Sequence, residues 1–202
     1  KQRLEFRRLA GTDFLLHGEQ RVSWTQLSST ASAGTTVLQL TSSVDWRPLD
    51  QVVVAPSREQ IAEGEVATIQ SVNGSQVTLT APLSYTHWGQ TQDFSNPTTT
   101  WTLDERAEVG LLTRNIKIQG DGTSTTAGNG GHMMTMDTSV VHASGIELYL
   151  MGQKSLLGRY PFHWHLLGNA PGQYIKNSSI HDSFNRCVTV HGTNDTLVAD
   201  NV

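Results

Sequence analysis

The chain has 202 residues and a formal net charge of −4, which is long enough for one large or two small domains with a buried core. Charged residues make up only 16% of it, and no basic block extends beyond the Arg7-Arg8 pair, which disfavours nucleic acid or an anionic membrane as the main partner. No apolar run approaches the roughly 20 residues that span a bilayer, and the lone Cys187 cannot form an internal disulfide.

The first half of the chain predicts a small antiparallel β-module over residues 24–103, with a linker at its end. Residues 35–40 (TTVLQL) alternate with the period of a half-buried strand. Two further alternating strands flank Asn73-Gly74, a favoured two-residue turn pair. The polar stretch 89–100, with Pro97, is predicted as a loop or linker. We expect residues 1–23 to be the end of a preceding domain or a capping strand.

Residues 104–202 predict the first coils of a right-handed parallel β-helix that continues past the C-terminus. Short apolar strands recur between Gly, Asn and Asp, and they are too short for helices. We align residues 132–136 over 163–167 and 187–191, at offsets of 31 and 24 residues, which also stacks Ile146 on Ile180. The expected fold class is therefore all-β with almost no helix.

Histidines form the main candidate site. In this alignment His132 stacks on His163, and His165 lies two residues further on the same face of the strand. Three imidazole nitrogens suit zinc, nickel or copper, so we predict a zinc-like divalent metal site at His132, His163 and His165. The alternative is a hydrogen-bonded ladder of histidines beside aromatic rings.

Arg159 and Tyr160 precede the central histidine strand, and we predict them, with His191 in the next coil, as substrate-binding residues. A guanidinium pairs well with a uronate carboxylate, and a tyrosine ring offers a stacking face for a sugar. In the alternative, Arg159 forms a salt bridge with Glu147 or Asp182 and holds the turn.

Candidate acid and base residues are Glu147, Asp182 and His181. The alignment places Glu147 and His181 at equivalent positions of adjacent coils, as hydrogen-bonded neighbours on the outer surface. A glycosidase needs two carboxyls about 5–10 Å apart, whereas a lyase acting on a uronate needs a base and a cation. The spacing selects neither, and the alternative is that these are ordinary polar residues that stabilise the stack.

Several long motifs resemble a known family. They include DERAEVGLLTRNIKIQG (104–120), GIELYLMGQ (145–153), LGRYPFHWHLLGN (157–169) and IHDSFNRCVTVHGTN (180–194). These motifs are similar to those of the cell-surface hyaluronidases, a family that includes the cell-migration-inducing hyaluronan-binding protein and shares its motifs with fibrocystin-like proteins. The resemblance implies that this region follows an eight-glycine domain.

The resemblance also implies an extracellular or cell-surface protein that binds a hyaluronan-like, anionic polysaccharide and depolymerises it, as a glycosidase or a lyase. Because a fold hosts many functions, membership supports carbohydrate recognition better than catalysis. The alternative is a non-catalytic adhesion module, or a structural β-helix of an extracellular coat or filament that associates with itself. Three acceptor sequons, at Asn73, Asn177 and Asn194, permit glycosylation outside the cell.

Overall fold

The computed structural model describes residues 13–202, which divide into two compact units. One unit contains residues 13–20 and 114–202, and the other contains residues 21–113. Residues 1–12 of the predicted first segment lie outside the described part. The only helical turns found in residues 13–202 are η1 (Ile61–Glu63) and α1 (Ser124–Ala127), and no helix there is long and apolar enough to cross a membrane.

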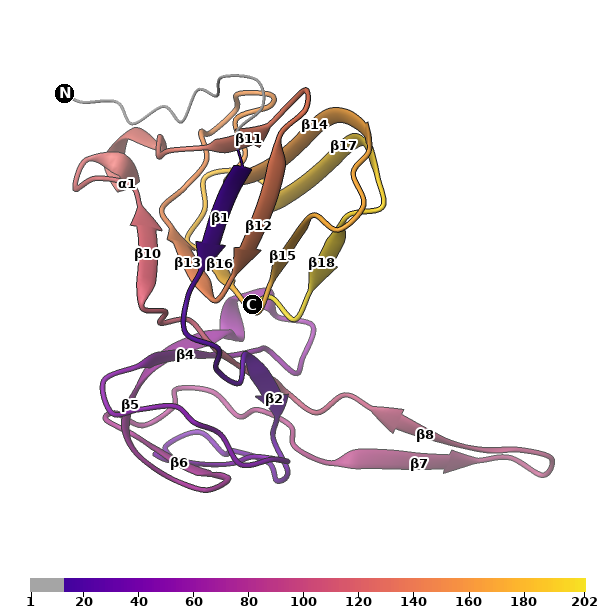
Figure 1. Cartoon of the computed structure of the whole chain (residues 1–202). Helices are drawn as coiled ribbons and strands as arrows, with labels where there is room; N and C mark the ends of the chain where they lie inside the picture. The colour runs from indigo at the N-terminus through magenta and orange to yellow at the C-terminus, as the bar shows by residue number, and fades with distance from the viewer. Residues whose placement is uncertain (1–12) are drawn as a thin grey trace. The chain divides into compact units, whose positions relative to one another are not determined.

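The unit that ends the chain is a parallel β-helix with three strands in each coil (Figure 1). Its three sheets have the strand orders β1-β12-β15-β18, β10-β13-β16 and β11-β14-β17, and every pairing within them is parallel. The strands are β1 (Asp13–His17), β10 (Ile116–Gln119), β11 (Met133–Thr135), β12 (Val140–Ser144), β13 (Ile146–Tyr149), β14 (Phe162–Asn169), β15 (Tyr174–Lys176), β16 (Ser179–His181), β17 (Val188–Asn194) and β18 (Leu197–Ala199).

Left-handed backbone corners turn the chain from one sheet to the next. The residues that follow β12, β15 and β18 are Gly145, Asn177 and Asp200, with φ of 65°, 50° and 52°. Glycine, asparagine and aspartate enter this conformation more easily than other residues do. The Gly, Asn and Asp residues between the short strands therefore mark the corners of successive coils, which explains why the sequence pattern predicted a solenoid.

The core of the β-helix contains one row of inward side chains from each sheet. The observed alignment of neighbouring strands differs from the predicted alignment. Strands β11 and β14 are neighbours, as expected, but Ile146 lies opposite Ile116, and Ile180 lies opposite Leu148. The predicted stack of Ile146 on Ile180 is therefore wrong by two residues. Both side chains still point inward, because a slip of two residues keeps a side chain on the same face of its sheet.

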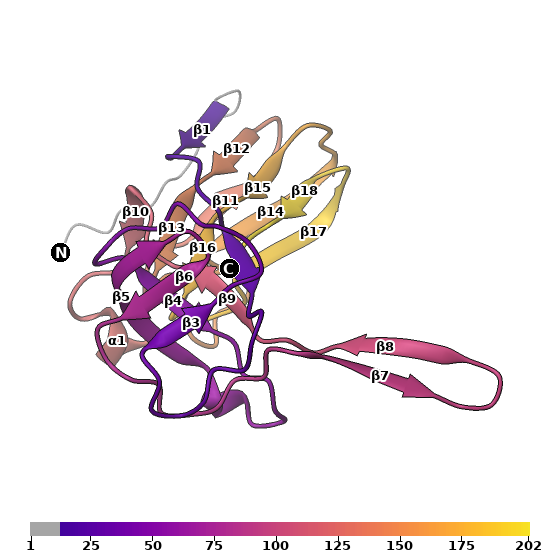
Figure 2. The same cartoon turned by 90° about the horizontal axis from the view of Figure 1, so that it is seen from below.

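The other unit is an antiparallel module built on a six-stranded sheet in the order β2-β9-β4-β5-β6-β3 (Figure 2). An isolated bridge between Leu27 and Leu40, which follow the two edge strands, joins the ends of the sheet around an apolar core. The strands are β2 (Trp24–Gln26), β3 (Val37–Gln39), β4 (Gln51–Val54), β5 (Glu65–Asn73), β6 (Gln76–Leu79) and β9 (Glu108–Leu111). The predicted fold class, an antiparallel module followed by parallel β-helix coils, is confirmed.

Three local predictions in this module need correction. The turn between β5 and β6 is Gly74-Ser75 rather than Asn73-Gly74, since Asn73 still pairs with Gln76 and Gly74 takes the positive φ of 61°. Residues 89–100, predicted as a loop, contribute to a hairpin of β7 (Thr91–Ser95) and β8 (Thr100–Asp104). Strand β9 pairs with β2 and β4, so the antiparallel unit reaches residue 113 rather than 103.

Replacing Ile146 by alanine tests the core of the β-helix. Because Ile146 is fully buried between coils, we expect Ile146→Ala to lower the free energy of unfolding by about 2–5 kcal/mol. Leu157, which is 91% exposed, provides the control, and Leu157→Ala should change the free energy of unfolding by less than about 0.5 kcal/mol. Urea unfolding of both variants measures the difference, and equal effects would contradict the assigned core.

Candidate functional site

The outer face of the sheet β11-β14-β17 carries a cluster of three histidines. His165 of β14 lies directly opposite His191 of β17, and His163 of β14 lies opposite Met134 and Thr189. The predicted stack of His132 on His163 is wrong by two residues, the same error as at Ile146. His191, which we had assigned to substrate binding, therefore takes the place predicted for His132 in the cluster.

His132 has a different neighbour. It precedes β11, and its Nε2 accepts a hydrogen bond of 2.7 Å from Arg159 Nη1. Arg159 thus pairs with His132, whereas the alternative from the sequence was a salt bridge to Glu147 or Asp182. Tyr160 is buried, and its ring makes a T-shaped contact with the His163 ring, with the centroids 5.0 Å apart. Its ring packs against the histidine cluster, although the sequence predicted a sugar-stacking face.

The state of His163 follows from its surroundings. The side chain is buried, and its Nδ1 lies 3.2 Å from the carbonyl oxygen of Gly158. Because a carbonyl only accepts, Nδ1 donates, and the lone pair of the neutral ring is on Nε2. That Nε2 is buried and has no hydrogen-bond partner. Burial lowers the pKa of His163 and outweighs the hydrogen bond to the Gly158 carbonyl, which raises it. The nearby imidazoles lower the pKa further, so the neutral ring is favoured.

The three histidines converge on one position. Their ligand nitrogens lie within 4.8 Å of one another, and the Nδ1 atoms of His165 and His191 share a hydrogen bond of 3.1 Å, in which one ring donates to the other. Two nitrogens bound to one tetrahedral zinc ion are about 3.4 Å apart, so small side-chain rotations suffice to bring all three to a metal. A metal-bound histidine usually donates its other nitrogen to a carbonyl, as His163 does to Gly158. The donor set therefore fits a divalent ion.

A second polar cluster joins three coils on the sheet β10-β13-β16. Glu147 Oε1 lies 2.6 Å from Lys117 Nζ and 3.2 Å from His181 Nε2, and Oε2 accepts from the Arg114 amide at 3.2 Å. His181 Nδ1 in turn contacts Asp182 Oδ2 at 2.8 Å. Glu147 and His181 are hydrogen-bonded, as the sequence suggested. However, Glu147 lies opposite Ser179 and is buried rather than on the outer surface.

The charges of this cluster stabilise one another. Burial raises the pKa of Glu147, but the hydrogen bonds from His181, Lys117 and the Arg114 amide outweigh it, so the net pKa lies below its usual value. Burial likewise lowers the pKa of His181, and its two carboxylate partners raise it above the usual value. The arrangement therefore favours an ionised carboxylate beside an imidazolium. A catalytic role of Glu147, Asp182 and His181 stays a prediction.

The stability of this cluster should depend on pH through His181. A histidine whose pKa is raised on folding contributes fully below the unfolded pKa of about 6.5, and loses that contribution as the pH rises through the folded value. We expect the difference in unfolding free energy between the native chain and His181→Gln to shrink as the pH rises above about 6.5. Denaturant titrations at several pH values measure it. The same comparison in a Glu147→Gln background is the control, and a difference that grows with pH would contradict the assignment.

Three similarities place the chain among known proteins. Residues 128–202 match the family model described as the CEMIP beta-helix. A G8 domain-containing protein of Dictyostelium discoideum is 37% identical over 191 residues, which cover 93% of this chain and 16% of that protein. Fibrocystin-L of Mus musculus is 37% identical over 224 residues, which cover 90% of this chain and 5% of that protein.

Among solved structures, a tailspike protein of Pseudomonas phage LKA1 aligns with 94% of this chain and 30% of its own, at 12% identity and a TM-score of 0.37. That similarity is too low to support a shared function. The chain spans about a sixth or less of the length of the two relatives above. The resemblance noted in the sequence is confirmed: residues 128–202 match the CEMIP beta-helix family model, and most of the chain aligns with fibrocystin-L and G8 domain-containing proteins.

Proposed function

We propose that the β-helix unit binds an anionic, hyaluronan-like polysaccharide outside the cell, at the face that carries His163, His165 and His191, with a zinc-class metal ion held by these three side chains. The observation that carries the proposal is the buried, unpartnered Nε2 of His163 beside two further imidazoles. A buried polar atom without a partner is costly, and a bound cation satisfies it. The family match to the CEMIP beta-helix supports the choice of ligand.

The residues around the cluster fit this role. Gly158 takes a positive φ of 79°, and its carbonyl fixes the ring orientation of His163. Tyr160 packs against His163 and excludes water from the inner side. His191 is exposed, so the cluster is open to solvent on one side. A bound zinc-class ion supplies a Lewis-acidic positive charge at this opening, where a uronate carboxylate can approach.

The Glu147 cluster favours binding without cleavage, as in an adhesion module. The carboxylates of Glu147 and Asp182 both contact His181, and Glu147 also holds Lys117. An ionised, hydrogen-bonded carboxylate is a poor proton donor to a leaving group. Depolymerisation, as a glycosidase or a lyase, is the second candidate function, and the family resemblance favours it.

Metal content distinguishes the corrected cluster from the predicted one. We expect the purified full chain to hold about one zinc-class ion, and His163→Ala, His165→Ala and His191→Ala each to lower its affinity at least about tenfold. His132→Ala is the matched control and should leave the metal in place, because His132 bonds to Arg159 instead. Elemental analysis after dialysis gives the content. Equal loss in His132→Ala and His191→Ala would contradict the assignment.

Polysaccharide binding should depend on the same residues. We expect immobilised hyaluronan to retain the native chain, and removal of the metal by a chelator to weaken binding about tenfold or more. His142→Ala, a change at a histidine of β12 away from the cluster, should bind normally. Released reducing ends, or the absorbance of an unsaturated uronate, would show cleavage. Unchanged hyaluronan binding by both the metal-free chain and His191→Ala would overturn the proposal.

A further inference from the structure

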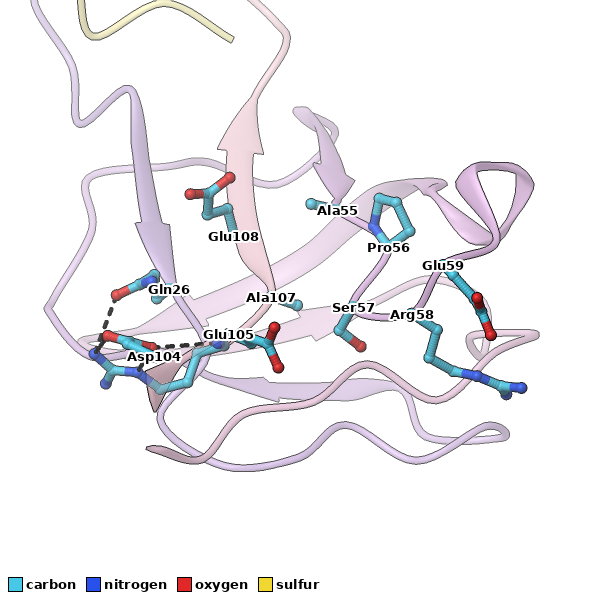
Figure 3. Close-up of a pocket in the computed structure, with 11 residues that line it drawn as sticks. Gln26, Ala55, Pro56, Ser57, Arg58, Glu59, Asp104, Glu105, Ala107 and Glu108 are labelled. Atoms are coloured by element: carbon cyan, nitrogen blue, oxygen red, sulfur yellow. Dashed lines mark hydrogen bonds and ion pairs between the residues drawn. The ribbon is translucent and has the colours of Figure 1, made fainter. Parts of the chain in front are cut away.

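The antiparallel unit contains two adjoining pockets that the proposed function does not use. The larger has a volume of about 630 Å³ and the smaller about 250 Å³, and Ser57, Arg58 and Glu105 line both. Figure 3 shows the larger pocket with Gln26 and Asp104 at one end, Arg58 and Glu59 at the other, and Glu105 between them. Because they share a wall, the two pockets form one groove, and its larger part falls within the usual range of small-molecule sites, about 300–1,000 Å³.

Trp88 gives the smaller pocket an aromatic wall. Its side chain is 36% exposed, in contrast to Trp46, which is buried in the core of the same unit. The indole Nε1 donates to the Gln90 carbonyl at 2.6 Å, and the backbone amide of Trp88 donates to Ser57 Oγ at 2.7 Å. The ring is therefore held in place before any ligand arrives, which reduces the entropy that binding costs.

Polar groups converge on the same groove. Arg58, Thr86 and Gln92 line the smaller pocket together with Trp88, and Glu105 lines both pockets. An aromatic ring beside several hydrogen-bonding side chains matches a pyranose, whose C–H face packs on the ring while its hydroxyls bond at the edges. Carboxylates accept hydrogen bonds from sugar hydroxyls, and amide and guanidinium groups complete the set.

The charge of the groove selects among sugars. Its larger pocket is lined by four carboxylates and two guanidinium groups, and the Arg106 guanidinium bonds to Asp104 at 2.6 Å. The net negative charge disfavours a uronate or a sulfated sugar. We propose that this groove binds an uncharged pyranose of an oligosaccharide, with Trp88 as the stacking platform and Glu105 as a hydroxyl acceptor. The site is separate from the histidine face and prefers a ligand of different charge.

The indole N–H resonances of the full-length chain give a direct test. The chain has five tryptophans, and the Trp88→Phe spectrum identifies the signal of Trp88. We expect a chito-oligosaccharide or a cello-oligosaccharide at millimolar concentration to shift that signal selectively, and Trp88→Ala to weaken the affinity about tenfold. Trp101→Ala is the matched control, because Trp101 is 48% exposed on β8 and lies outside both pockets. The affinity of Trp101→Ala for the uncharged oligosaccharide should equal that of the native chain.

A charged sugar tests the selectivity of the groove. A hyaluronan oligosaccharide should leave the Trp88 signal unchanged in the native chain and shift it more in Glu105→Gln, where one negative charge is removed. Binding of the uncharged sugar should persist in His163→Ala, so failure here is distinguishable from failure of the metal site. The proposal is overturned if neither uncharged sugar shifts the signal, if Trp101→Ala weakens binding equally, or if only a lysine-rich peptide shifts it, which would assign the groove to a protein partner.

Discussion

Parallel backbone hydrogen bonding between successive coils is the constraint on which the β-helix unit depends. It brings equivalent residues of neighbouring coils to within about 4.8 Å, so each outward or inward position becomes a row. Inward rows, such as Ile116, Ile146 and their neighbours, make the core. Outward rows bring polar side chains together whether or not they are close in sequence. His165 and His191 meet in this way, on adjacent strands of one sheet.

The same stacking produces two polar clusters with opposite electrostatics. On the sheet β10-β13-β16, Glu147 meets a lysine and a histidine in adjacent coils, and paired charges offset the cost of burial. On the sheet β11-β14-β17, His163 is buried beside two other imidazoles without a carboxylate, and desolvation favours its neutral form. The first arrangement holds ionised groups in place, whereas the second leaves a lone pair available to a cation. This difference explains why we place ligand binding at the histidines rather than at the most buried carboxylate.

The antiparallel unit is organised differently. Its sheet curves around an apolar core, and the proposed groove is lined by strand residues and connecting segments, not by stacked rows. Each unit would then contribute its own kind of site, one suited to an anionic sugar and one to an uncharged sugar.

The sequence by itself determined the fold class, because Gly, Asn and Asp at strand ends and alternating apolar residues within strands are local signals that each coil repeats. It also determined that His163 and His165 share a face, since alternation along one strand requires it. Only the tertiary structure decided which residues lie opposite them. Because the coils differ in length, the sequence allows alignments of neighbouring strands that differ by two residues. A two-residue slip keeps every inward side chain inward, so the apolar pattern cannot detect it. That slip exchanged His132 for His191 in the cluster and placed Glu147 opposite Ser179 instead of His181. The hairpin β7–β8 was missed because its side chains are almost all exposed, and burial is the signal by which a sequence reveals a strand.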